Sequence, residues 1–195
     1  MIDTVKKLLI VLMLLAGMTA AAQNGHMMFK GIPIDGNLTT FVNKLKQKGF
    51  SVLQSENGVA MLKGDFAGQK NCVVGVYEHE SKIVNRVVVM FPSKDTWTYL
   101  YNDYRNLKDM LTEKYGEPAG VQEEFPDAST YNFNDSDRMH EVRMGRCRYI
   151  CDWETENGAI ELRIEHNLML GCMVVLLYID GENDSKVRAR AIDDL

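Results

Sequence analysis

The stretch IVNRVVVMFPSKDTWTYLYNDYRNLKDMLTEKYGEP, residues 83–118, holds the two kinds of element that decide the fold. It opens with a β-branched run over residues 83–91 that stops at Pro92, which predicts a strand. The run Val87-Val88-Val89 indicates burial on both faces of that strand.

The second half of the same stretch predicts an amphipathic helix over residues 95–115. Ser93 or Asp95 can cap its start, and Gly116 and Pro118 end it. Large apolar residues recur every three or four positions: Trp97, Leu100, Tyr101, Tyr104, Leu107, Leu111 and Tyr115. This stripe needs a partner surface, and a sheet with one apolar face supplies it.

Toward the N-terminus the sequence predicts the same two kinds of element in the opposite order, a helix followed by strands. Leu38, Phe41, Val42 and Leu45 repeat at helical spacing, Asn37 or Thr39 can cap the helix, and Gly49 stands at its end. Strands are predicted at 50–54, 58–65 and 71–80, before the one at 83–91. The dipeptide Asn57-Gly58 predicts a hairpin.

Toward the C-terminus the sequence again predicts four strands, at 120–125, 138–154, 159–166 and 169–179. The long one places Arg143, Cys147 and Tyr149 on one face, and Asn157-Gly158 predicts the next hairpin. The last strand is apolar throughout, as a central strand would be. Residues 126–137 read as a polar loop, and residues 181–195 as a C-terminal tail or short helix.

One helix and four strands thus occur twice, in units of about 37–91 and 94–180. We expect an α+β fold in which two αβ-meander units form one curved antiparallel sheet with both helices packed on one face. Residues 23–180 make a single domain in this interpretation.

The first 22 residues predict a secretory signal peptide. Lys6 and Lys7 precede a short apolar run, and Ala20-Ala21-Ala22 offers a cleavage site before Gln23. The alternative is an uncleaved anchor, for which the apolar run is short. The expected location is periplasmic or secreted, with no membrane span after signal cleavage.

The net charge argues against nucleic acid or an anionic membrane as the partner. The formal charge is −5, and loss of two lysines and one aspartate with the leader makes it −6. Both of those partners require a basic patch.

Four cysteines, at 72, 147, 151 and 172, leave three disulfide pairings open in an exported chain. On one strand, Cys147 and Cys151 would lie about 13 Å apart, too far for a bridge. Each therefore pairs with Cys72 or Cys172, or all remain free and buried.

The usual catalytic patterns are missing from the sequence. No G-x-S-x-G elbow, P-loop or G-x-G-x-x-G is present, and no cysteine pair has zinc-ligand spacing. Cys72 and Cys172 sit in apolar runs, unlike reactive thiols. The sequence therefore assigns no catalytic, cofactor-binding or metal-binding residue, and predicts no enzyme and no cofactor.

Several stretches resemble exported proteins of Bacteroides-type bacteria that carry no assigned function. They are HMMFKGIPIDGNLTTFVNKLKQKGF (26–50), LKGDFAG (62–68), the Trp97–Tyr115 stripe with its KYGEP end, and DWETENGAIELRI (152–164). The resemblance implies an exported location. The repeated αβ-meander also resembles, at fold level alone, the β-lactamase-inhibitor-protein-like folds.

The expected sheet has one face free of helices, and that face suggests a function. Tyr77, His79, Arg143 and Tyr149 are expected there, and such residue types favour interfaces. The leading hypothesis is a non-enzymatic module that binds a protein partner in the cell envelope. The alternative is a small-ligand-binding protein or envelope hydrolase, with its site at the sheet edge or in the 126–137 loop.

Overall fold

The computed structural model describes residues 25–80, 82–125 and 133–193, so the expected signal peptide and most of the 126–137 loop lie outside the described residues. The first unit holds β1 (Met28–Phe29), β2 (Ile32–Pro33), α2 (Leu38–Gln47), β3 (Ser51–Glu56), β4 (Val59–Phe66), β5 (Gln69–Glu78) and β6 (Val84–Met90). The second holds α3 (Trp97–Tyr115), β7 (Gly120–Glu124), α4 (Asp135–Arg143), β8 (Arg148–Thr155), β9 (Gly158–Asn167), β10 (Gly171–Asp180) and α5 (Gly181–Asp193).

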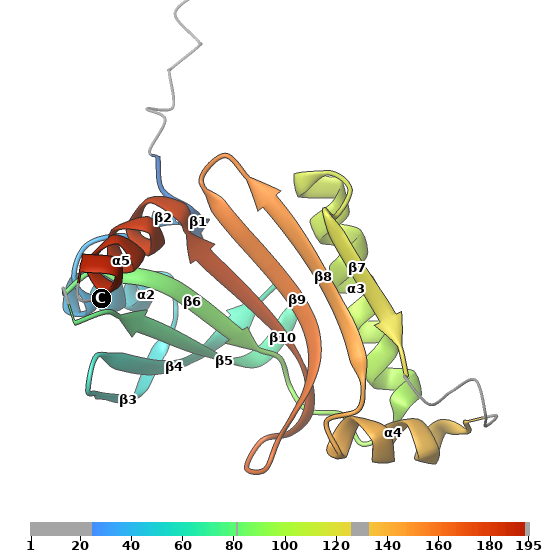
Figure 1. Ribbon diagram of the computed structural model, residues 1–195. Coiled ribbons are helices and arrows are strands. Elements are labelled where there is room, and N and C mark those ends of the chain that lie inside the picture. Colours follow the sequence, from blue (N-terminus) through green and yellow to red (C-terminus); the bar gives the residue numbers. More distant parts are fainter. Residues whose placement is uncertain (1–24, 81, 126–132, 194–195) are drawn as a thin grey trace, which may run out of the picture.

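Eight strands form one antiparallel sheet in the order β3-β4-β5-β6-β10-β9-β8-β7, and β1 and β2 form a separate pair. The expectation of an α+β fold with a large antiparallel sheet is confirmed. Each half of the sheet is a meander, and the last strands of the two meanders, β6 and β10, meet in the middle. Figure 1 shows the two halves twisting away from each other along this seam.

The helices α2 and α3, which the sequence predicts, pack on the same side of the sheet (Figure 1). The helix α2 buries Leu38, Phe41, Val42 and Leu45, and α3 buries Trp97, Leu100, Tyr104, Leu107 and Leu111, all in one apolar core. The strands supply alternate residues to that core, for example Val74, Val87 and Leu176. We call this side of the sheet the helix face.

The helix α2 begins where the sequence predicts a cap. The Asn37 side chain accepts a hydrogen bond from the backbone N–H of Thr40 at 2.9 Å. Such a cap satisfies one of the free N–H groups of the first turn. Both Asn-Gly hairpins also form, β3 with β4 and β8 with β9.

A buried carboxylate ties the start of the described chain to its end. Asp180, at the end of β10, is fully buried and accepts hydrogen bonds from the backbone N–H groups of Met27 (2.6 Å) and Asn183 (2.8 Å). His26 Nδ1 lies 3.1 Å from the same carboxylate. Asn183 in turn donates to the carbonyls of Ile34 and Val84. These bonds fix the first turn of α5.

The prediction of a continuous strand over residues 138–154 is wrong in its first half. Residues Asp135–Arg143 form α4 instead, and β8 begins only at Arg148. A capping box explains the helix: Asn134 accepts from the N–H of Asp137, whose side chain accepts from the N–H of Asn134. The apparent alternation over 138–143 came from polar residues on the exposed side of a helix that buries Met139 and Val142.

All four cysteines carry free thiols. Cys72, Cys151 and Cys172 are buried on the helix face, and Cys147 is half-buried in the segment that precedes β8. The sequence leaves disulfide pairing and free thiols open, and the structure has the free thiols.

Candidate functional site

The side of the sheet opposite the helices, which we call the open face, carries a broad apolar area over β4, β5, β6 and β10. Strand register aligns its members in rows, such as Met61, Gly75, Val88 and Leu177. The whole set is Val59, Met61, Val73, Gly75, Tyr77, Val88, Met90, Met173, Val175, Leu177 and Ile179. We call this set the apolar half of the open face.

No described helix buries a side chain against the apolar half. The buried residues of α2, α3 and α4 belong to the helix-face core, apart from Glu141, and α5 buries only Asn183. The expected burial of Val88 on a second covered face is therefore wrong, since Val88 is only half-buried. The apolar residues of β6 and β10 therefore lie alternately on the helix face, which is covered, and on the open face.

Side chains on the open face shield one another. Val175 is 3 % exposed and Met173 2 % exposed, although both lie outside the helix-face core. The best-defined example is at Gly75, where an added Cβ would lie 3.1 Å from Tyr77 Cε2 and 3.4 Å from Met61 Sδ. The Tyr77 ring thus lies over the bare backbone of Gly75, beside the Met61 sulfur.

The other half of the open face, over β9, β8 and β7, is charged and predominantly acidic. Its carboxylates are Asp152, Glu154, Glu161, Glu165 and Glu124, and its cations are Arg163 and Arg148. Arg163 lies along β9 between Glu161 and Glu165 and pairs with both. Five acids against two arginines leave this acidic half with a net negative charge.

Two of these acids stand directly opposite each other. Asp152 on β8 is the register partner of Glu161 on β9. Burial, and next the charge of Glu161, raise the pKa of the Asp152 carboxyl above its ordinary value. Directly opposed like charges destabilise an antiparallel pair of strands. The Asp152–Glu161 pair therefore lowers the stability of the fold.

The structure does not bring together the four residues expected at an interface. Tyr77 lies on the open face, where its register partner is Arg86. His79 follows the end of β5, and its N–H donates to the carbonyl of Ile83. Arg143 ends α4 and does not belong to a strand.

Tyr149 lies on the helix face, so the expectation that it shares a face with Tyr77 is wrong. Its ring contacts those of Trp97, Tyr101 and Tyr104 of α3, with centroid distances of 5.0, 5.9 and 5.8 Å. The predicted alternation within β8 is right, but the face assigned to Tyr149 is wrong. The shift comes from α4, which breaks the continuous strand that was used to count the faces.

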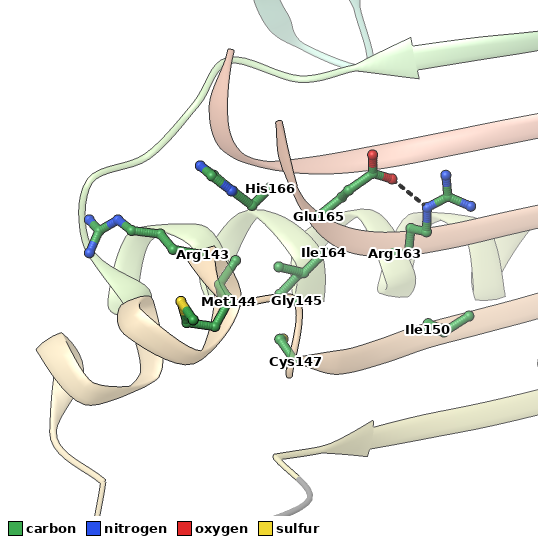
Figure 2. Close-up of a pocket in the computed structure, with 10 residues that line it drawn as sticks. Arg143, Met144, Gly145, Cys147, Ile150, Arg163, Ile164, Glu165 and His166 are labelled. Atoms are coloured by element: carbon green, nitrogen blue, oxygen red, sulfur yellow. Dashed lines mark hydrogen bonds and ion pairs between the residues drawn. The ribbon is translucent and has the colours of Figure 1, made fainter. Parts of the chain in front are cut away.

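Beside the acidic half, the sheet opens into a pocket of about 460 Å³ that we call the α4 pocket (Figure 2). The pairing of β8 with β9 begins only at Ile150 and Arg163, so the last residues of β9 have no neighbour on that side. The segment after α4 passes there instead. The pocket is lined by Val142, Arg143, Met144, Gly145, Cys147, Ile150, Arg163, Ile164, Glu165 and His166.

The hairpin between β9 and β10 ends in an exposed apolar tip. Leu168 is 95 % exposed and Met169 93 %, and Asn167 Oδ1 accepts from the N–H groups of Met169 and Leu170. Figure 1 shows this hairpin projecting beyond the rest of the sheet. Turn positions usually hold polar residues, so the tip adds apolar surface just before the start of β10.

The thiols of the helix face lie in apolar or hydrogen-bonded surroundings. Cys151 Sγ lies 2.9 Å from the hydroxyl of Tyr104, which also donates to Glu123 at 3.1 Å. Burial raises the pKa of the Cys72, Cys151 and Cys172 thiols, so these groups stay protonated near neutral pH.

Comparison with protein-family models, with curated proteins and with solved structures finds no match to the chain. Within the part of the chain that the structure describes, no three His, Cys, Asp or Glu side chains are grouped to hold a metal ion. Among those same residues, no helix has both the length and the apolarity that a membrane crossing needs.

Proposed function

We propose that this protein is an exported, non-enzymatic module of the cell envelope that binds a protein partner on its open face. One observation carries the proposal: no described helix buries an apolar side chain against the apolar half of the open face. Contiguous apolar surface of this kind marks interaction sites on soluble domains. The leader-like N-terminus supports the exported location.

The chemistry of the face defines the partner. Apolar side chains of the partner would lie over Met61, Val88 and Leu177, and the Tyr77 ring would pack against them as an anchor residue. Lysine or arginine would lie over the Asp152–Glu161 pair and offset its repulsion. A surface that joins an apolar area to basic residues is therefore the expected match.

Affinity capture from envelope fractions tests this proposal with a matched pair of variants. Val88→Lys places a charge at the centre of the apolar half, whereas Asn106→Lys places the same charge on the exposed side of α3. We expect the wild type and Asn106→Lys to retain one common partner and Val88→Lys to lose it. Equal capture by all three proteins would refute the proposal, provided that thermal melting shows all three to be folded.

The exported location has a separate test. N-terminal sequencing of the protein recovered from the envelope should begin at Gln23. An intact Met1 on protein confined to the cytoplasm would contradict this part of the proposal.

The α4 pocket favours a second candidate function, the binding of a small ligand at the sheet edge. The pocket is concave and combines apolar walls with a few polar groups, as ligand sites do.

A further inference from the structure

We infer that the α4 pocket is a binding site for an organic carboxylate with an apolar body, held by Arg143 and His166 at its basic end. The inference rests on the second candidate function and names its ligand class. It is independent of a partner on the apolar half, because Arg143 and His166 do not belong to the open face.

The pocket exists because two strands separate. Beyond the Ile150–Arg163 pair, β9 continues to Asn167 while the chain before β8 turns away toward α4. In an antiparallel sheet, alternate residues point their N–H and C=O groups to the same side. Part of the backbone from Ile164 to Asn167 therefore faces the gap and adds hydrogen-bonding groups to its wall.

The basic side chains of the pocket differ in the partners that they already have. Arg163 pairs with Glu165 and Glu161 on its own strand, and the Arg163–Glu165 pair is drawn in Figure 2. Arg143 and His166, by contrast, have no ion pair or side-chain hydrogen bond among the described residues. Figure 2 shows their side chains extending on the same side of the pocket, away from the Arg163–Glu165 pair.

The other walls of the pocket do not oppose an anion. The thiol of Cys147 is neutral, since burial raises its pKa to about 12. Met144, Ile150 and Ile164 supply apolar surface, and Glu165, the carboxylate among the lining residues, is paired with Arg163. An anionic group fits at the Arg143–His166 end, and an apolar body fits against the remaining wall. Arginine suits this role because its planar fork matches a carboxylate.

Titration of the isotope-labelled protein in NMR spectra tests the assignment with three probes: hexanoate, 1-hexanol and inorganic phosphate. We expect hexanoate to shift amide signals of residues 143–147 and 163–166. Hexanol has the same apolar body without the charge, and phosphate has charge without the body. Both should bind at least about fivefold more weakly than hexanoate, as loss of one modest interaction implies.

Variants separate a specific site from general attraction. Arg143→Gln and His166→Gln should each weaken hexanoate binding, the first by about fivefold. Arg188→Gln, on the exposed side of α5, is the matched control and should bind as the wild type does. Equal binding of hexanol and hexanoate, no effect of Arg143→Gln, or shifts confined to the apolar half would each overturn the inference.

A carboxylate with an apolar body has two sources, a free acid and the C-terminus of a polypeptide. A short peptide ending in two leucines, compared as free acid and as amide, distinguishes them. Binding of the peptide acid in preference to hexanoate assigns the site to a chain terminus, and the reverse preference assigns it to a small acid. If none of these probes binds, the inference is refuted, whereas the result of the Val88→Lys capture experiment does not depend on them.

Discussion

Substitution of Asp152 by asparagine should stabilise the protein while weakening its binding of a partner. Asp152 and Glu161 are register partners on the open face, so their Cβ atoms lie about 5 Å apart. Two like charges at that distance repel by about 0.8 kcal/mol in water. Arg163 already pairs with Glu161 and reduces this repulsion. We therefore expect a gain of about 0.5 kcal/mol in the free energy of unfolding at pH 7.

The gain should depend on pH in a defined direction. The pKa of Asp152 is raised in the folded protein, by burial and then by Glu161. The penalty is therefore present when Asp152 is ionised, above its raised pKa, and it disappears as pH falls toward and below the ordinary value of 3.8. The advantage of Asp152→Asn should be full at pH 7 and should shrink as pH falls through that window.

Urea denaturation at several pH values measures this difference through the transition midpoint. Asp109→Asn, on the exposed side of α3, removes the same charge between Arg105 and Glu113, whose opposite effects offset, and should change stability little. Destabilisation by Asp152→Asn at pH 7, or a gain that does not vary with pH, would refute the account of the acidic pair. Unchanged partner capture would refute its proposed role in binding.

The remaining predictions concern the framework that holds the two faces in place. Asp180→Asn should cost about 3 kcal/mol in urea denaturation, because it disrupts charge-assisted bonds to a buried carboxylate, whereas Asp184→Asn, which is partly exposed, should cost under about 1 kcal/mol. Gly158→Ala should cost at least about 3 kcal/mol, since its Cβ would lie 2.0 Å from a β10 carbonyl oxygen and its φ is 147°. Gly68→Ala, with a positive φ but open space, should cost only about 1 kcal/mol in the same assay. A thiol reagent should titrate four cysteines after unfolding and react slowly with the native protein, Cys147 included; fewer than four would reveal a disulfide.

The elements that could be predicted from sequence are those whose signals are local. The period of apolar residues in α3, the cap of α2 and the two Asn-Gly turns each depend on a few neighbouring residues. The helix α4 was missed because its capping box lies in a polar segment and its apolar residues are few. Asn134 followed by Asp137 was the available signal.

The candidate site was predicted only in part for the same reason. The position of Tyr77 on the open face follows from simple alternation within one strand. The face of Tyr149 depended on counting across residues 138–147, where the helix intervenes, and the count failed. The α4 pocket has no local signal, since it arises where β8 and β9 separate.

By itself, the sequence determined the helices and strands other than α4, and that both central strands are apolar on each side, because backbone propensity and side-chain periodicity act over a few residues. Only the tertiary structure decided that β6 meets β10 and that the apolar residues of α2, α3 and α4 pack in one core on one side of the sheet. Those outcomes depend on contacts between residues about 90 positions apart, as in the Leu176–Val89 pair, and no local pattern encodes which strand a strand will meet.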